Sequence, residues 1–448
     1  MLLRGQRIRY DSIIPLDSAA RSVKVFNISG GSQTTYTADT CQAIANINAA
    51  GGINASTITK LDLGLGRPVM LQVFNEDHRN FIRHGANANT GAIQHEVILV
   101  DAEGNIDPST PFMFDYEKIT KIIVCEIDTT PITINGGIFT TYANCPEVST
   151  NTAYARNIQV SRPNTTVMNV THKIEREGDT GAAYDGFLRV HLTYNVTFDN
   201  CVYTGHKIYT NSSGTQIGNY DISATSSINI RWIDCDQTNF FRNESTGETT
   251  EFTRWGVMVS SYCKNLSFDG CRLSRVDAHA GIYNVSIKNS TLINITIDGG
   301  GTAFVENTTL YNKEAITLRK DYGSFWHGDI ILKNITFQNL GDNATGVVNL
   351  IDATWYYDNH DYGYPTPLPT NITADGVNVA TNAEIRVFKN AFVIGTTDIA
   401  NGNSSMTAPE KITVANTNGY TVVFPDKTLY PFFANTEYST TISENPAN

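Results

Sequence analysis

Acidic and basic side chains recur at one place in this 448-residue sequence, a few residues upstream of a repeated strand-like phrase. In chain order they are Asp185, Asp221, Arg254, Asp277 with His279, and Arg319 with Asp321. If these segments align on successive turns of a coil, the side chains form a groove of carboxylates, guanidiniums and one imidazole. Carboxylates on adjacent turns would stand about 5 Å apart, which suits a retaining glycosidase, and a two-turn offset suits an inverting one. These residues are therefore candidate catalytic groups for hydrolysis of a sugar polymer.

The same groove also suits a β-elimination. That reaction needs a base that removes a proton beside a uronate carboxylate, and a cation that neutralises this carboxylate. His279 with Arg254 or Arg319 fits these two roles. All the charged residues also have structural interpretations, as coil corners (Asp185, Asp221) or as ion pairs within a turn (Arg275 with Asp277 and His279, and Arg319 with Asp321).

Large aromatic side chains gather in apparent insertions between the repeated phrases. Sugar rings bind by stacking an apolar face on flat side chains while their hydroxyls take polar partners. The candidate substrate-binding residues are Trp255, Tyr322, Trp326, Trp355 and Tyr357. Packing of loops onto the coil is the alternative role for each of them.

The repeated phrase itself is the strongest pattern in the sequence. It occurs at 195–201, 229–235, 265–271, 284–290 and 304–308, and again at 334–339 and 371–376. The first five copies end 34, 36, 19 and 18 residues apart, which indicates one unit that is doubled where a loop is inserted. Apolar and polar residues alternate within each copy, and the copies end in turn-forming Asn, Asp or Gly. A strand repeated on every turn stacks on its neighbours at about 4.8 Å and buries a continuous core, so the sequence predicts an all-β parallel β-helix.

The cysteine and asparagine positions support this interpretation. Cys201, Cys235 and Cys271 share one repeat position and are predicted to stack as reduced, buried side chains. The seven cysteines show no CxxC spacing, so no metal site and no cofactor is predicted. Most of the sixteen Asn-x-Ser/Thr sequons, Asn195 and Asn265 among them, lie at the repeat's corner. There an asparagine takes a left-handed turn or stacks its amide on the next coil, which we favour over glycosylation.

Three regions are expected along the chain. Residues 1–60 form an N-terminal segment in which 37–51 have helical spacing and a glycine stop, as expected for a short helix that caps the open end of the coil. Residues 61–380 form the β-helix with loop insertions, and the first coils are expected within 61–145. Residues 381–448 contain further coils, a cap or an oligomerisation segment.

Charge and hydropathy exclude two classes of partner. With 32 basic and 44 acidic side chains the net charge is −12, which disfavours nucleic acid as a partner. No apolar run is long enough to span a membrane. The N-terminus lacks the apolar stretch of a secretory signal. Either a signal has been removed, or the protein leaves the cell another way, as a virion protein does on lysis.

Several segments resemble known β-helix proteins. The phrases Asn195-Val-Thr-Phe-Asp-Asn-Cys201 and Asn265-Leu-Ser-Phe-Asp-Gly-Cys271, with the preceding helix and the long insertions, resemble the pectate-lyase-like superfamily of right-handed parallel β-helices. That superfamily includes polysaccharide lyases, polygalacturonases and phage tailspikes, and the resemblance covers about residues 35–380. The polygalacturonase signature is absent, and no calcium-dependent pectate lyase pattern is evident. The resemblance therefore implies the fold and transfers no catalytic residue.

Together these observations predict a phage tailspike-like protein of the virion that binds a bacterial surface polysaccharide, with cleavage of that polysaccharide left open. A homotrimer is expected, with other tail proteins as further partners. A secreted extracellular polysaccharide lyase or glycoside hydrolase is the first alternative. A non-catalytic structural or adhesive β-helix is the second.

Overall fold

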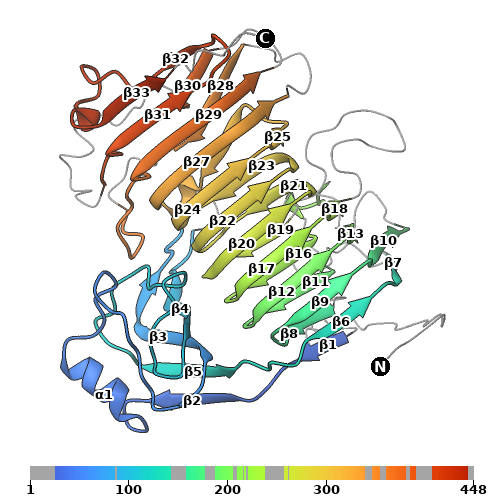
Figure 1. Ribbon diagram of the computed structural model, residues 1–448, viewed down its shortest axis with the longest axis vertical. Coiled ribbons are helices and arrows are strands. Elements are labelled where there is room, and N and C mark those ends of the chain that lie inside the picture. Colours follow the sequence, from blue (N-terminus) through green and yellow to red (C-terminus); the bar gives the residue numbers. More distant parts are fainter. Residues whose placement is uncertain are drawn as a thin grey trace.

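The computed structural model (Figure 1) describes residues 26–85, 88–142, 158–176, 187–204, 209–214, 216–217, 220–237, 257–260, 262–338, 346–353, 360–379, 384–389 and 406–441. In this part of the chain, parallel strands stack coil upon coil from β1 near the N-terminal end to β33 near the C-terminal end. Four further strands and one helix form a separate N-terminal unit beside the stack. The parallel β-helix expected from the repeats is therefore confirmed.

Three columns of parallel strands, here called sheets I, II and III, make up the coil. Sheet I consists of β1 (Phe26–Ser29), β8 (Ile158–Ser161), β11 (Leu188–His191), β16 (Ile222–Thr225), β19 (Val257–Ser260), the ends of β21 (Arg272–Asp277) and β23 (Thr291–Ile297), β26 (Glu314–Leu318), β28 (Val347–Asp352), β30 (Glu384–Phe388) and β32 (Thr421–Val423). Sheet II consists of β6 (Ile132–Asn135), β9 (Thr165–Met168), β12 (Tyr194–Asp199), β17 (Ile228–Ile233), β20 (Cys263–Asp269), β22 (Ile282–Lys288), β24 (Gly299–Glu306), β27 (Trp326–Phe337), β29 (Asn371–Val379), β31 (Lys411–Ala415) and β33 (Glu437–Thr441). Sheet III consists of β7 (Ile138–Tyr142), β10 (Thr171–Glu175), β13 (Val202–Tyr203), β18 (Asp236–Gln237), the beginnings of β21 and β23, β25 (Thr309–Leu310), and the ends of β27 and β29. A two-stranded antiparallel pair, β14 (Tyr209–Thr210) with β15 (Gln216–Ile217), lies in one connection, and two 3-10 turns are Lys320–Tyr322 and Pro431–Phe433.

The repeated phrase lies on sheet II, where its apolar residues stack in register inside the coil. Phe198, Trp232 and Phe268 are paired by register on successive coils and are wholly buried. Their ring centroids are 5.7 and 4.5 Å apart, in stacked geometry. One continuous apolar cluster runs from Ile158 to Phe433 through the described coils. Each coil thus buries its apolar face against its neighbours, as expected for a solenoid.

The corners of the coil hold the predicted asparagine and cysteine ladders. Asn200 Nδ2 donates to Asn169 Oδ1 at 2.8 Å, and Asn284 Nδ2 donates to Asn265 Oδ1 at 3.0 Å. All four residues have positive φ, between 48 and 59°. Left-handed backbone is tolerated by asparagine, and the stacked amides satisfy each other. The structural interpretation of these corner asparagines is confirmed.

The cysteine ladder is also confirmed. Cys201, Cys235 and Cys271 are buried and free. Their thiols donate to backbone carbonyls of the preceding coil, those of Val167, Phe198 and Trp232, over 3.4–3.6 Å. No disulfide occurs among the described cysteines, and Cys145 lies outside the described residues.

The N-terminal unit is an antiparallel sheet in the order β2 (Gln33–Thr37), β5 (Lys121–Glu126), β3 (Val69–Asn80), β4 (Ala92–Val100). One face carries Val69, Leu71 and Val73, which pack with Ile44 of helix α1 (Gln42–Ala49). The opposite face carries Met70, Val97 and Leu99, which pack with Leu192 and Ile228 of the β-helix. This alternation places apolar groups on both faces of the sheet, so the β-helix covers the second face.

Two details of the predicted organisation need correction, and one open alternative is resolved. The helix exists, but it covers the antiparallel sheet and does not cap the coil, because Ile44 packs in the cluster of that sheet and not in the coil's core. Strands β3, β4 and β5 within 61–145 are antiparallel, and only β6 and β7 of that range belong to coils. Of the alternatives for 381–448, the described residues continue the coils through β30 to β33.

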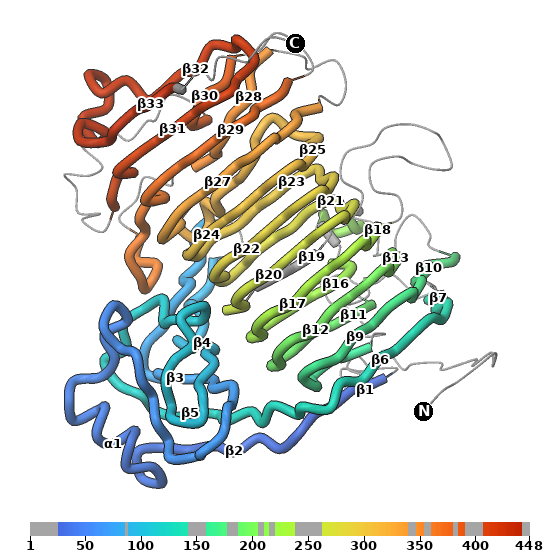
Figure 2. Tube along the Cα trace, in the orientation of Figure 1, coloured from blue at the N-terminus to red at the C-terminus, as the bar shows by residue number. Residues whose placement is uncertain are grey.

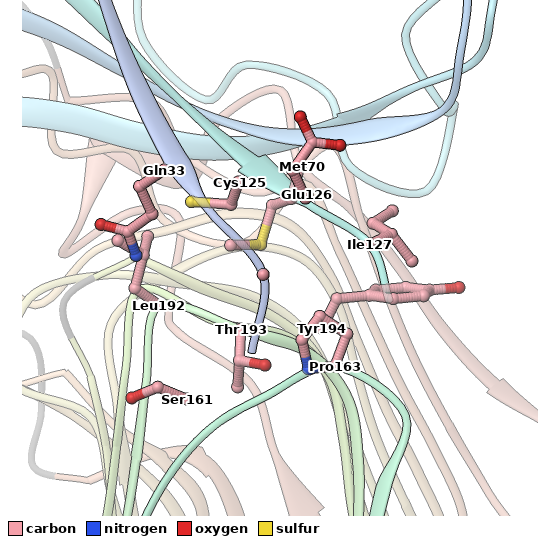
Figure 3. A pocket seen from close by; sticks show the side chains of 11 residues that line it. Gln33, Met70, Cys125, Glu126, Ile127, Ser161, Pro163, Leu192, Thr193 and Tyr194 are labelled. Carbon is pink, nitrogen blue, oxygen red and sulfur yellow. The ribbon is translucent and has the colours of Figure 1, made fainter. Parts of the chain in front are cut away.

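A buried ion pair and a small pocket mark where the two units meet. Lys264 Nζ of β20 lies 2.9 Å from Glu96 Oε2 of β4, with both side chains fully buried. Nearer the first coils, a small pocket lies between the units. Its wall includes Met70 and Cys125 from the antiparallel sheet and Leu192 and Thr193 from a coil corner (Figure 3). Figure 2 shows the N-terminal unit in blue alongside the lower coils.

Candidate functional site

Sheet I presents an outward column of mainly polar residues, which the register of its strands aligns. Register pairs Gln159 with Arg189, Arg189 with Ser223, Ser223 with Met258, Met258 with Asp277, Asp277 with Thr296, Thr296 with Thr317, and Thr317 with Asp352. The residues on either side of Asp277, Val276 and Ala278, point into the core. Because side chains alternate along a strand, the column lies on the outer surface of the coil.

Asp277 is the centre of a hydrogen-bonded cluster on this surface. Its Oδ1 lies 2.5 Å from an Arg319 guanidinium nitrogen, and its Oδ2 lies 3.0 Å from Arg275 and 3.4 Å from His279 Nε2. The Tyr220 hydroxyl donates to the same Oδ2 at 2.6 Å. Asp277 is completely buried beneath these partners although it points outward from the coil.

The chain of charges continues beyond Asp277. Arg319 also pairs with Asp321 at 2.8 Å, and Asp321 in turn pairs with Arg83 at 2.7 Å. Arg83 belongs to the connection between β3 and β4 of the N-terminal sheet. We call these seven residues, Tyr220, Arg275, Asp277, His279, Arg319, Asp321 and Arg83, the Asp277 cluster.

Both carboxyl groups of the cluster are ionised. Burial opposes ionisation of Asp277, but the charges of Arg275 and Arg319 outweigh it and hold the pKa of Asp277 well below its usual range. Burial likewise opposes ionisation of Asp321, and Arg319 and Arg83 outweigh it, so the pKa of Asp321 is also lowered. Neither group can donate a proton as a general acid near neutral pH.

His279 and Tyr220 stay neutral for a different reason. Burial lowers the pKa of His279, and the attraction of Asp277 only partly offsets it. Burial and then the Asp277 charge raise the pKa of Tyr220. The two side chains are hydrogen-bonded over 2.6 Å. Because the single Tyr220 proton goes to Asp277, His279 Nε2 must carry the proton of the second bond, which leaves Nδ1 as the basic nitrogen.

A third carboxyl group lies just behind the cluster. Asp298 follows β23 and is fully buried, and its Oδ1 accepts a hydrogen bond from the Gly281 amide at 2.9 Å. Its Oδ2 has no hydrogen-bond partner among the described residues. Burial raises the pKa of Asp298 to about 8, against the opposing attraction of Arg319. Asp298 is therefore a neutral acid at neutral pH, without contact with solvent.

The structure brings together four of the predicted catalytic residues: Asp277, His279, Arg319 and Asp321. Asp221 is buried immediately before β16 and follows Tyr220 of the cluster in the chain. Asp185 and Arg254 lie outside the described residues, as do the aromatic residues Trp255, Trp355 and Tyr357.

The two described aromatic candidates are not available to stack on a sugar, so this expectation is wrong for both. Trp326 is a core residue with no exposed surface, and its indole nitrogen donates to the Gly301 and Asp329 carbonyls. Tyr322 is 6 % exposed, and the guanidinium carbons of Arg319 and Arg83 lie 5.6 and 5.8 Å from its ring centroid. The Tyr322 ring instead makes cation–π contacts with the two guanidiniums of the cluster.

Sequence reasoning missed Tyr220 and Arg83. Tyr220 directly precedes Asp221, so its position in a polar segment before β16 was a usable signal. The prediction selected the carboxylate of Asp221 rather than the neighbouring hydroxyl of Tyr220. No local signal marks Arg83, because it reaches the cluster from a different fold unit.

A second charged group lies further along the same column. Lys389 Nζ lies 3.0 Å from both Glu314 and Asp352, and the Lys389 side chain is 36 % exposed. We call these three residues the Lys389 cluster. Among the described residues, no group of three or more His, Cys, Asp or Glu is arranged to hold a metal ion. None of the described helices is long and apolar enough to cross a bilayer.

No protein-family model matches the sequence, and no curated protein matches it. Solved structures with a similar shape include three phage tailspikes, each 12 % identical to this chain. One is the Gp54 tailspike of Acinetobacter baumannii bacteriophage AP22 in complex with A. baumannii capsular saccharide, with a TM-score of 0.47 over 93 % of this chain and 72 % of that one. The others are gp61 of Pseudomonas phage phi297 (TM-score 0.43, 92 % of this chain, 64 % of that one) and gp49 of Pseudomonas phage LKA1 (0.38, 88 % and 64 %). At this identity and these TM-scores, the similarities assign neither a family nor an activity to this chain.

Proposed function

We propose that this protein is a tailspike-like β-helix that binds a bacterial surface polysaccharide along the outer face of sheet I. The observation that carries the proposal is the outward polar column that passes through the Asp277 cluster. Coils repeat at about 4.8 Å, so the column offers hydrogen-bonding groups at regular intervals to an extended polymer. At the edge of the cluster, Arg275 and His279 keep 24 and 28 % of their side chains exposed.

Two long connections adjoin strands of this face in the sequence. Residues 238–256 precede β19, and residues 353–370 follow β28. Loops on a rigid scaffold are where binding residues concentrate. Three of the aromatic candidates, Trp255, Trp355 and Tyr357, belong to these connections, so they remain proposed substrate-binding residues.

Cleavage by the cluster is a second candidate function, and the described residues favour β-elimination over hydrolysis. Hydrolysis requires a protonated acid beside the scissile bond, whereas Asp277 and Asp321 are ionised and Asp298 is out of reach of solvent. In the elimination, His279 Nδ1 removes the proton on the carbon next to the uronate carboxylate. The bond to the leaving oxygen breaks with its electron pair, a carbon–carbon double bond forms, and the proton passes to the leaving oxygen. A cation of the cluster neutralises the carboxylate.

The first experiment is incubation with a panel of bacterial capsular, O-antigen and plant acidic polysaccharides. Binding is measured directly, and products are followed by new reducing ends and by the ultraviolet absorbance of an unsaturated uronate. Binding to at least one polymer is expected. The proposal is wrong if no polymer binds and no product forms.

Substitution of His279 tests whether any observed turnover depends on the Asp277 cluster. H279A should lose about 100-fold or more of it, the range of a lost general base. H327A is the matched control, because His327 is an exposed histidine on sheet II. Equal turnover in H279A and wild type would remove His279 from the mechanism and leave binding as the function.

Assembly provides an independent test of the tailspike-like assignment. We propose a homotrimer within a virion, where other tail proteins are its partners. Solution mass should then be three times 49.2 kDa. A monomer would favour the alternative of a secreted enzyme.

A further inference from the structure

The N-terminal sheet does more than cover the side of the β-helix, because the segment after β3 enters the Asp277 cluster. Phe81 has φ of 53°, a left-handed conformation that is rare for a bulky residue. Such backbone strain persists only where surrounding contacts hold it, and it gathers at functional positions. The segment from Phe81 to Arg83 therefore calls for a functional explanation.

The contacts that hold this strain are aromatic. The Phe81 ring is 2 % exposed, and its centroid lies 4.7 Å from Tyr364, 5.4 Å from Tyr262 and 6.0 Å from Tyr322. The Phe81 ring also requires glycine at position 281, because an added Cβ there would come within 2.7 Å of the ring. The next residues are fixed by backbone bonds from Ile82 N to Tyr362 O and from His84 N to Asp321 O.

These contacts of residues 81–84 position the Arg83 guanidinium in the cluster. Arg83 lies between the two backbone bonds, pairs with Asp321 at 2.7 Å and keeps 22 % of its side chain exposed. Its Nε is buried and has no hydrogen-bond partner among the described residues. A guanidinium offers five N–H donors, so one carboxylate does not exhaust its capacity.

The cluster is thus an alternating row of charges with an arginine at each end: Arg275, Asp277, Arg319, Asp321 and Arg83. Three guanidiniums face two carboxylates, and His279 is neutral. The three inner members, Asp277, Arg319 and Asp321, keep 0, 9 and 16 % of their side chains exposed, whereas the terminal Arg275 and Arg83 keep 24 and 22 %. Although the protein has a net charge of −12, the described members of this cluster carry an excess of positive charge at its rim.

We propose that Arg83 and Arg275 each bind an anionic substituent of the polysaccharide, such as a uronate carboxylate, and that Phe81 is the positioning residue for Arg83. This inference rests on the proposed function, and it adds that the substrate is acidic and that the N-terminal sheet supplies part of its site. Guanidiniums suit planar carboxylates because they form paired, charge-assisted hydrogen bonds.

The test compares acidic polymers with their neutral counterparts. The probes are polygalacturonate, alginate and hyaluronate, each beside its carboxyl-reduced form, with the acidic and neutral capsular polysaccharides of the panel. We expect wild type to bind at least one acidic polymer. The affinity for its reduced form should be lower by a factor of about ten or more, as for one lost charge-assisted hydrogen bond.

Variants then locate the effect. R83Q should lose this preference for the acidic form, and R83K should keep part of it. R67Q is the matched control, because Arg67 lies on the same N-terminal unit and pairs with Glu126, away from the cluster. F81A should lower the preference as R83Q does, and the double variant should show no further loss, since both changes act through Arg83.

The outcomes separate the two proposals. Equal binding of acidic and reduced polymers, or an R83Q variant that keeps the wild-type preference, overturns the acidic subsite and leaves polysaccharide binding intact. Binding to neutral polymers alone does the same. Absence of binding to every polymer overturns both proposals.

Discussion

The Asp277 and Lys389 clusters lie on the same outward column of sheet I and are built from the same kinds of charges, but they differ in burial. Asp277 is fully buried and Arg319 keeps 9 % of its side chain exposed, whereas Asp352 keeps 13 % and Lys389 keeps 36 %. Asp277 has four described partners from three regions of the chain: Tyr220, the β21 segment and Arg319. Asp352 has a described ion pair with Lys389 of the next coil.

The comparison teaches that position on the column does not by itself make a chemical site. Removal from water strengthens electrostatic interactions, and it makes each partner costly to lose. Around Asp277, Tyr220 and the segment after β3 exclude water, which shifts the pKa values of four groups. Around Lys389, the pKa of the lysine rises because Asp352 and Glu314 outweigh the effect of burial, as in an ordinary surface ion pair.

The sharpest test of this contrast is D277N. The variant leaves Arg275 and Arg319 without their shared carboxylate, and loss of one partner from a buried ion pair costs about 3–5 kcal/mol. We expect the free energy of unfolding to fall by about that amount in denaturant titration near neutral pH.

The pH dependence of D277N has a defined sign. Because the folded pKa of Asp277 is depressed, its stabilisation is complete above the ordinary value of 3.8 and is lost as the pH falls below it. The gap between wild type and D277N should therefore narrow in acid. A variant as stable as wild type at neutral pH would contradict the described network.

F81A tests whether the N-terminal segment really covers the Asp277 cluster. Truncation of a buried Phe costs about 3–5 kcal/mol, and release of the positive φ offsets part of it. Hydrogen exchange should increase in residues 78–84 and 360–364, which contact each other. F304A, at a half-buried ring on sheet II, is the control and should leave exchange in these segments unchanged.

D298N should raise the stability of the protein, whereas D277N lowers it. The folded pKa of Asp298 is raised from 3.8 to about 8, so wild type loses stability as the pH rises through that interval, by at most about 1.4 kcal/mol per pH unit. Asparagine has nearly the same shape and cannot ionise. The melting temperature of D298N should exceed that of wild type at pH 8 and approach it at pH 4, and parallel pH profiles would show that Asp298 is not buried as described.

D352N should have the smallest effect. A partly exposed ion pair contributes about 1 kcal/mol or less, and Lys389 still pairs with Glu314 at 3.0 Å. Denaturation of D352N beside D277N measures the contrast between the clusters directly. Equal losses in the two variants would mean that burial does not distinguish them.

Much of the β-helix was predictable because its contacts repeat along the sequence. The corner asparagines and the stacked Cys201, Cys235 and Cys271 recur at fixed places in the repeated phrase, so one local pattern predicts many contacts between coils. The antiparallel order of β3, β4 and β5 was missed because those strands do not repeat.

The candidate site was predicted in part. Asp277, His279, Arg319 and Asp321 lie at or just after the ends of β21 and β26, so the predicted alignment of coils included them among the residues of one groove. Trp326 was misjudged because an aromatic residue at the start of a strand suits the core as well as a surface.

The sequence by itself determined the coil, its stacked core, its corner chemistry and the presence of acidic and basic groups on one face, because each depends on residue type and spacing within a repeat. The tertiary structure alone decided which of these groups are buried from solvent. Tyr220, Phe81 and Arg83 reach Asp277 and its partners from outside the repeat, and burial depends on contacts between segments that no local pattern relates.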